Sequence, residues 1–411
     1  MSRQTRPPAR RTARLLPPAA PPPRGPAPVR WLVLLAAPTA VGANVLVLTL
    51  PDIAAAFDTD VRSAAWLATT FAVAMAVGTP LIAGLLRRRG MRTALFLSTA
   101  LLAAGTALLA VAPWLPLALV GRAAQGAGGA GMVTVAMGLA GTTRRMGALT
   151  AGFGALGAAG PLAGAHLSDA VSWRLALAVS ALPLLAVPAV LRYARPAPTA
   201  TDPFDARGAL LLAALASSLA LVPVAPAPAL GAGAAFLALL AHHVRRRPDG
   251  FVPRAVLRSR TFVASCALIA VCSVQYFVLL FAVPRLISDR AGWSTPSIGT
   301  GQLVALVTGS ALTWALTAVA HRASRTAIRL ALLAVTAAAL TTATLSGSAW
   351  LLLVVAGASV FTATSANAAL SVHAARSAPE PLRPTAIGLF TLVYQLGGAI
   401  GPGIATVLVL D

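Results

Sequence analysis

Arg122 is the residue whose type and position most directly suggest chemistry in this sequence. It lies in the run 119–130, where every other residue is apolar, small or an uncharged amide. A charge inside an apolar segment costs several kcal/mol unless it faces a cavity or a polar partner, so it indicates a functional site. The alternative is that the side chain reaches an interface, because Arg122 follows the start of the segment by only about two helical turns.

Glycines are concentrated in the same apolar segment and in the next one. Small residues let membrane helices approach closely, and a proline inside a helix removes a hydrogen bond and favours a kink. We expect either simple tight packing or a seal that holds one side closed while two halves of the protein rock. The candidates for this coupling or conformational role, besides Arg122, are Gln125, Gly126, Gly157, Gly160, Pro161 and Gly164.

Isolated polar residues in other apolar segments are candidates for a substrate cavity. Each could instead form a hydrogen bond between helices. A surrounding lining of alanine, leucine and valine would suit an apolar or amphipathic solute. The cavity candidates, in addition to Gln125, are Asn44, Gln275, Tyr276, Asn367, Tyr394 and Gln395.

Enzymatic and metal chemistry find little support in the sequence. Glu380 is its single glutamate, and no segment combines a nucleophile with a base. Cys266 and Cys272 lie six residues apart in one apolar segment, and residues at that spacing do not share a helix face. No cysteine–histidine spacing typical of a metal site occurs. We therefore expect no enzyme, no cofactor and no metal.

The elements that must position these residues are membrane helices. The chain is 58% hydrophobic and 10% charged, whereas soluble domains carry about 25% charged residues. Its apolar runs have the length that crosses about 30 Å of hydrocarbon as helix. We expect an all-α integral membrane protein with about 13 spans, at about 31–50, 64–86, 93–112, 115–141, 146–167, 175–193, 208–224, 229–243, 261–284, 298–320, 328–345, 349–372 and 386–409.

The net charge of +22 follows membrane topology. Of the 32 basic residues, 27 fall in the N-terminal tail or in alternate loops that share one side. This is the positive-inside pattern, which predicts a cytoplasmic N-terminus. We therefore expect a multi-pass protein of the cell (inner or plasma) membrane, with the lipid bilayer and not nucleic acid as its surroundings.

The chain divides into four regions. Residues 1–30 are basic and proline-rich and are expected to form a disordered cytoplasmic tail. Residues 31–195 form an N-terminal half of six helices, 196–260 hold two linking helices with cytoplasmic loops, and 261–411 form a C-terminal half of five helices. The sequence Gly-Ala-Ala-Gly-Pro at 157–161 returns as Gly-Ala-Ile-Gly-Pro at 398–402, as expected for repeated transporter halves.

These motifs resemble those of the major facilitator superfamily, in particular its fourteen-helix drug:proton antiporter branch. Arg122, Gln125 and Gly126 are similar to motif B, which that family uses in proton transfer. The segment 157–164 is similar to motif C, which favours export. The two linking helices resemble those of the fourteen-helix subgroup, although the last helix of the C-terminal half is then apparently absent.

The sequence departs from the family pattern where acids are expected. In the loop between the second and third helices, Arg87 stands where the family has an aspartate, and the acid of the first helix aligns with Gly42. A proton-coupled carrier needs a membrane group that loads and releases protons. The gating-loop residues implied by the resemblance are Arg87, Arg88, Gly90 and Arg92.

The sequence therefore predicts a secondary transporter, an exporter of drugs or metabolites of hydrophobic or amphipathic character, with protons as a candidate coupling ion. We expect it to act as a monomer on a small-molecule substrate. The missing acids motivate an alternative, a transporter-like membrane scaffold or sensor without transport activity.

Overall fold

The computed structural model describes residues 25–140, 143–194, 204–319 and 325–409. Over these ranges the regular structure is helical throughout and contains no strand. The expected all-α fold is thereby confirmed. Most of the expected tail at 1–30 lies outside the described residues.

The N-terminal half begins with a span broken into three short helices and continues with long ones. Its third expected span is joined to the second, since α4 runs through both. Its elements are α1 (Val29–Ala36), α2 (Pro38–Asn44), α3 (Leu46–Ala56), α4 (Val61–Val111), α5 (Leu115–Ala140), α6 (Thr143–Ala170), α7 (Trp173–Ala178), the 3₁₀ helix η1 (Val179–Ala186) and α8 (Val187–Leu191).

Two linking helices and the C-terminal half follow. The remaining elements are α9 (Ala206–Ala220), α10 (Pro226–Arg246), α11 (Arg254–Leu257), α12 (Arg260–Ala291), α13 (Thr295–Val319), α14 (Arg325–Leu345), α15 (Ala349–Arg376), the 3₁₀ helix η3 (Glu380–Leu382) and α16 (Arg383–Val409).

Each of the thirteen expected spans coincides with one or more of these helices. By length and composition, eight described helices can cross a membrane, and a ninth qualifies if the bent pair Val29–Asn44 and Leu46–Ala56 forms one span. The expected count of about 13 spans is thus larger than the number of described helices that are individually long and apolar enough. Helix α9 is one of those that fall short, with only 15 residues.

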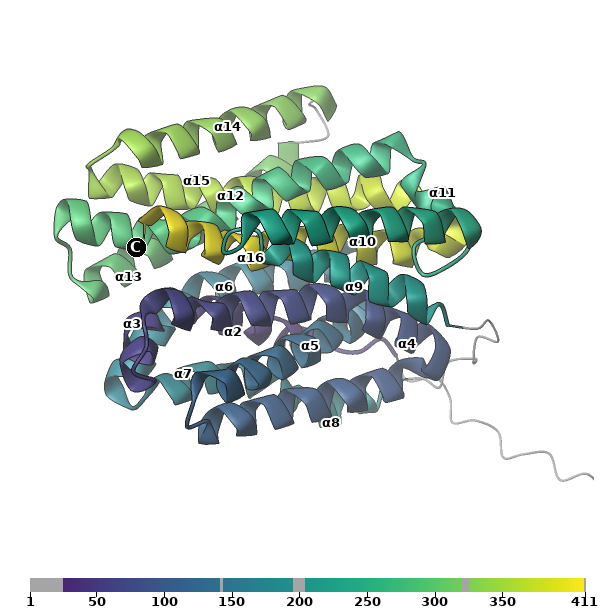
Figure 1. Ribbon diagram of the computed structural model, residues 1–411, viewed down its shortest axis with the longest axis horizontal. Helices are drawn as coiled ribbons and strands as arrows, with labels where there is room; N and C mark the ends of the chain where they lie inside the picture. Colours follow the sequence, from purple (N-terminus) through teal and green to yellow (C-terminus); the bar gives the residue numbers. More distant parts are fainter. Residues whose placement is uncertain (1–24, 141–142, 195–203, 320–324, 410–411) are drawn as a thin grey trace, which may run out of the picture.

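The long helices lie roughly parallel in two groups (Figure 1). Helices α2 to α8 form one group, and α12 to α16 form the other. Helix α16 packs against both α12 and α4, and α13 packs against α6, so these helices join the groups. The candidate site lies along this junction.

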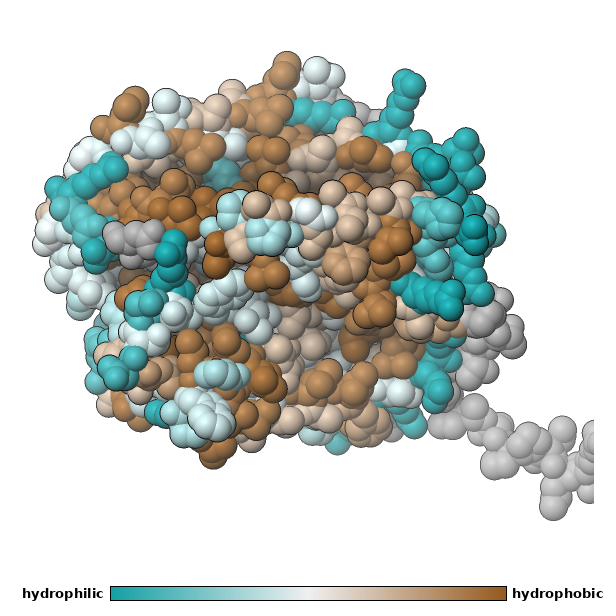
Figure 2. All heavy atoms as spheres, in the orientation of Figure 1, coloured by the Kyte–Doolittle hydropathy of each residue, from teal (hydrophilic) through white to brown (hydrophobic). Residues whose placement is uncertain are grey.

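The surface agrees with a membrane-spanning orientation along the helix axes. Hydrophilic side chains gather at the helix ends, most clearly near α10 and α11, and hydrophobic ones cover the flanks between the ends (Figure 2). Exposed apolar side chains include Leu210, Trp350 and Leu408. Apolar side chains are favourably placed against lipid tails, whereas their exposure to water would cost free energy.

Local signals set several boundaries. The Asp60 side chain accepts a hydrogen bond from the Ser63 N–H and thereby caps α4. These hydrogen bonds hold the pKa of Asp60 below its ordinary value. Within α4, Gly90 has φ 83°, a left-handed conformation that glycine adopts without steric cost. This one residue forms the break between the second and third expected spans.

Candidate functional site

The first span bends by 58° between Asn44 and Leu46. The Thr49 hydroxyl donates to the carbonyl of Val45 at 3.1 Å, and such bonds from a side chain to the preceding turn bend helices. Pro51 lies inside the following turn and has no N–H to donate. The bend presents backbone carbonyls to the neighbouring helices.

Arg122 lies on α5 and points to this bend. Its side chain is fully buried, with 0% exposure, so it does not reach an interface as the alternative interpretation required. Nη2 donates to the Gly42 carbonyl at 3.1 Å, and Nη1 donates to Oε1 of Gln125 at 2.9 Å. Nε donates to the Leu67 carbonyl over 3.4 Å, and the guanidinium carbon lies 4.2 Å from the ring centre of Phe71. The cation is therefore held by neutral groups.

Gln125 extends this network to two further elements. Its Nε2 donates to the Thr106 hydroxyl at 2.9 Å and to the Leu177 carbonyl at 3.3 Å. Since Oε1 receives the Arg122 bond, both ends of the amide are used. Arg122 and Gln125 together link α2, both arms of α4, α5 and α7.

Close backbone contact accompanies the network. A Cβ added at Gly126 would lie 2.3 Å from the Phe71 carbonyl oxygen, a distance that side chains do not tolerate. The glycine is therefore required for α5 to approach α4, which brings Arg122 within reach of Leu67 and Phe71.

The glycines of α6 pack against the other side of the bend. Nδ2 of Asn44 donates to the Gly157 carbonyl at 3.0 Å. Added Cβ atoms would lie 2.7 Å from Cβ of Asn44 at Gly160 and 2.3 Å from the Val45 carbonyl oxygen at Gly164. Pro161 is buried between them. The glycine-rich motif of α6 thus packs directly against the bend, while the motif of α5 reaches the first span through Arg122.

Several cavity candidates come together where the two helix groups meet. The side chains of Asn44 and of Tyr276 on α12 lie next to each other. The Phe277 ring lies 4.8 Å from that of Tyr276 and 6.0 Å from that of Tyr394. A small cavity of about 30 Å³ lies beside them, with Asn44 and Gln395 in its wall.

Two candidates lie elsewhere. Oε1 of Gln275 accepts a bond from the Thr362 hydroxyl at 3.3 Å, within the C-terminal group. Asn367 is half-buried on α15 and is not among the residues that line the described cavity. Nothing in the sequence separates these two from the other cavity candidates.

The gating-loop residues connect α4 to other elements at one end of the bundle. The Arg88 guanidinium lies 5.2 Å from the ring centre of Phe204. Nε of Arg92 donates to the Ala194 carbonyl at 3.2 Å. Arg87 lies on α4, and its side chain is outside the described part of the chain. This loop therefore contacts the end of the sixth expected span and the start of the linking helices.

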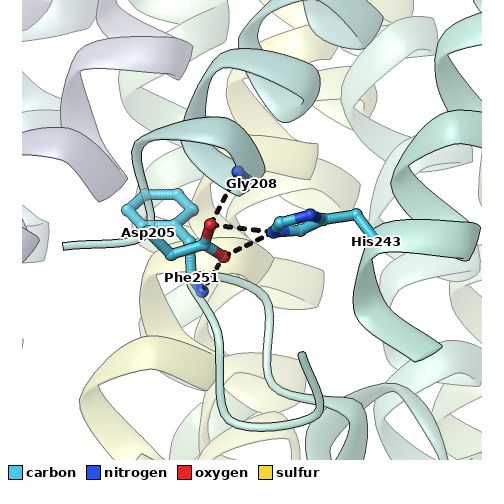
Figure 3. Close-up of polar contacts among 4 residues, drawn as sticks. All are labelled: Asp205, Gly208, His243 and Phe251. Atoms are coloured by element: carbon cyan, nitrogen blue, oxygen red, sulfur yellow. Dashed lines mark hydrogen bonds and ion pairs between the residues drawn. The ribbon is translucent and has the colours of Figure 1, made fainter. Parts of the chain in front are cut away.

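A polar cluster that the sequence analysis missed lies at that start (Figure 3). Asp205 caps α9 by accepting from the Gly208 N–H at 3.0 Å, and it accepts from the Phe251 N–H at 2.9 Å. Nε2 of His243 lies 2.8 Å and 2.9 Å from its two oxygens. Burial raises the pKa of Asp205, but these bonds outweigh it and hold the pKa below its ordinary value. An aspartate just before an apolar run was the available signal.

The comparison with known families agrees with this architecture. The family model described as Major Facilitator Superfamily matches residues 32–402. No curated protein matches the chain.

Proposed function

The chain belongs to the major facilitator superfamily of membrane transporters, and from that premise we propose that it exports hydrophobic or amphipathic small molecules by alternating access. We place it in the plasma membrane with its N-terminus in the cytoplasm. The observation that carries the proposal is the joint at the bend of the first span. There Gly42 is bonded to Arg122, Asn44 is bonded to Gly157, and the Asn44 side chain also lies next to that of Tyr276.

The joint links elements that must move relative to one another in alternating access. Transporters of repeated halves rock one half against the other around a site near the midplane. Asn44 belongs to the N-terminal half and Tyr276 to the C-terminal half. The contact between them would break or change as the halves rock, while the hydrogen bonds of Arg122 would hold the helices of the N-terminal half together.

The small cavity supports a state closed around the site. A site that encloses a drug-sized ligand has a volume of about 300–1,000 Å³, and the cavity here holds about 30 Å³. Substrate binding would therefore require the two halves to separate. The rocking of the halves supplies that opening.

The cavity wall supports the substrate class. It consists of small and aromatic apolar side chains with the two amides of Asn44 and Gln395. Such a wall favours an apolar body with one or two polar groups, because a polyvalent anion would lose its hydration without a paired charge. The lining residues besides these amides are Ala43, Ala68, Phe71, Ala72, Met75, Phe277, Phe281, Gly398 and Pro402.

We propose that this chain differs in its driving force from the drug:proton antiporter branch, whose motifs it resembles. Proton exchange commonly uses a carboxylate inside the membrane. Among the described residues, acids occur only in connections or towards helix ends, at Asp52, Asp58, Asp60, Asp169, Asp205, Asp249, Asp289 and Glu380. We therefore expect export that follows the substrate gradient and persists after the proton gradient is collapsed.

A dye-efflux experiment tests the proposal. Cells that are loaded with an amphipathic dye, such as ethidium, and moved to dye-free medium should lose at least one such dye faster when they express the chain than when they express Arg122→Ala at equal membrane abundance. An uncoupler should leave this faster downhill loss of dye unchanged.

Equal dye retention across a broad panel, with the protein present in the membrane, would contradict export and favour the scaffold or sensor alternative. Uphill export that the uncoupler abolishes would contradict only the proposed driving force. The two results are therefore distinguishable.

A further inference from the structure

The linking helices α9 and α10 enclose a second hollow, a groove of about 330 Å³. It lies away from the joint described above. One stripe of each helix forms its walls, because the lining positions recur at helical spacing. These positions are Arg207, Leu210 and Leu211 on α9, and Leu239, His242, His243 and Arg246 on α10.

The groove has a basic end and an apolar body. Arg207 is the second residue of α9, and Arg246 is the last residue of α10. The contact between Asp205 and His243 holds these two helix ends together (Figure 3). The leucines lie further along the helices, about one to two turns from the arginines.

No described residue neutralises the basic end of the groove. Arg207 and Arg246 are exposed, and neither has a hydrogen-bond or ion-pair partner within the described ranges. The nearby acid, Asp205, is only 7% exposed, and its oxygens are occupied by two backbone N–H groups and by His243. Among the described residues, the two arginines therefore present unpaired charge beside the groove.

The apolar body is on the surface that faces lipid. Leu210 is 71% exposed and Leu239 is 52% exposed. Helix α10 is long and apolar enough to span a membrane, although only 22% of its most apolar stretch is buried inside the protein. A molecule in this groove can therefore lie partly in the bilayer.

We propose that this groove binds an anionic phospholipid. Its phosphate lies between Arg207 and Arg246, where each guanidinium can donate two hydrogen bonds to phosphate oxygens. An acyl chain lies along Leu210, Leu211 and Leu239. Basic pockets between membrane helices at the cytoplasmic side are suited to lipid headgroups of this charge, and the arginine distribution predicts that this end is cytoplasmic.

The test measures lipid binding by the full-length protein and does not depend on transport. Native mass spectrometry in neutral detergent would compare phosphatidylglycerol with phosphatidylcholine of the same acyl chains. The variant Arg207→Gln/Arg246→Gln should bind phosphatidylglycerol about 30-fold more weakly, because each basic residue near the surface contributes about a fivefold share.

A matched control removes the same charge outside the groove. Arg245 and Arg254 are exposed and do not line it, so Arg245→Gln/Arg254→Gln should change the affinity by less than about threefold. An equal loss in both double variants would overturn the site, since only net charge would then matter. Equal binding of phosphatidylcholine by the unmodified protein would overturn it as well.

A second arm separates a lipid from a free anion. Inorganic phosphate at millimolar concentration should fail to displace phosphatidylglycerol, and Leu239→Ser should weaken lipid binding while both arginines remain. Displacement by phosphate with no effect of Leu239→Ser would contradict the lipid assignment. Because the substituted side chains are exposed, an unchanged unfolding temperature is expected and serves as the check on folding.

Discussion

The two halves of the molecule join their first and fourth helices in different ways. In the N-terminal half, the fully buried Arg122 on α5 bonds to the Gly42 carbonyl on α2. In the C-terminal half, the Thr362 hydroxyl on α15 bonds to Oε1 of Gln275 on α12. The first contact is made by a cation with several acceptors, and the second by two neutral side chains.

The degree to which the polar atoms are satisfied also differs. Each of the three guanidinium nitrogens of Arg122 donates to an acceptor. Nε2 of Gln275 is buried and has no hydrogen-bond partner in the described structure. A partly satisfied buried amide can exchange partners at little cost, whereas a buried cation held by three acceptors is expensive to disturb. The comparison suggests a rigid N-terminal half and a C-terminal half that rearranges.

The halves are alike in the helix that covers this contact. Gly160 on α6 lies against Cβ of Asn44, and Gly401 on α16 lies against Cβ of Phe277. Both helices also carry a buried proline, Pro161 and Pro402. The packing of these glycines therefore repeats, while the polar contacts beneath them do not.

The largest effect is expected from removing the cation. Arg122→Ala leaves the acceptors at Gly42 and Gln125 without a donor, at a cost of about 3 kcal/mol. We expect dye export to fall to background and the unfolding temperature of the purified protein to drop. Arg122→Lys keeps the charge but loses the forked guanidinium donors. Its dye export and its unfolding temperature should therefore lie between those of the unmodified protein and those of Arg122→Ala. Full export by Arg122→Ala would contradict the distinction between the charged contact of the N-terminal half and the neutral contact of the C-terminal half.

A glycine series sharpens the likeness between the halves. Gly160→Ala and Gly401→Ala would bring a methyl group to 2.7 Å and 2.5 Å from the neighbouring helix, and such overpacking costs about 1–3 kcal/mol. Thermal unfolding should show similar losses for both. Gly231→Ala, which meets nothing within 4 Å, is the control and should be neutral or stabilising. A loss at only one of the two sites would contradict the repeat.

A smaller effect is expected at the contact between the halves. Asn44→Ala removes the hydrogen bond to Gly157 and the contact with Tyr276, at a cost of about 1–3 kcal/mol. Since the contact belongs to the closed state, we expect a shift towards open conformations. Spin labels at Leu115 and Val304 on opposite halves would report it as a longer or broader distance distribution. An unchanged distance distribution would argue against a role for the Asn44 contacts in closure.

The smallest effect is expected from the neutral contact of the C-terminal half. Thr362→Val keeps the shape of the side chain and removes a single bond to an amide, at about 1 kcal/mol or less. Export should stay within about threefold of the unmodified protein. A loss as large as that of Arg122→Ala would show that the two contacts are equivalent and would end the distinction between the halves.

Much of this arrangement could be predicted from the sequence for physical reasons. Apolar runs of membrane length gave the helices, and an isolated charge in one of them identified Arg122. Burial of Arg122 could not be separated from an interfacial position, because both fit a residue two turns inside a helix. Its partners are backbone carbonyls of Gly42 and Leu67, which have no side-chain signature.

The polar cavity candidates were harder to sort. Asn44 and Gln275 are both amides in apolar helices, and only the packing places one at the junction and the other within a single half. The Asp205–His243 cluster was missed because its residues are far apart in sequence. The bend at Val45 was also not expected, because threonine, the residue type at position 49, is common in straight helices.

Counterflow in reconstituted proteoliposomes tests the central claim most directly, because it requires alternating access but no driving force. Vesicles loaded with unlabelled dye should take up labelled dye when they contain the unmodified protein, at equal pH on both sides. Folded Arg122→Ala should give no uptake above empty vesicles. Equal counterflow by Arg122→Ala, or none by the unmodified protein for any dye that it exports in cells, would contradict the account.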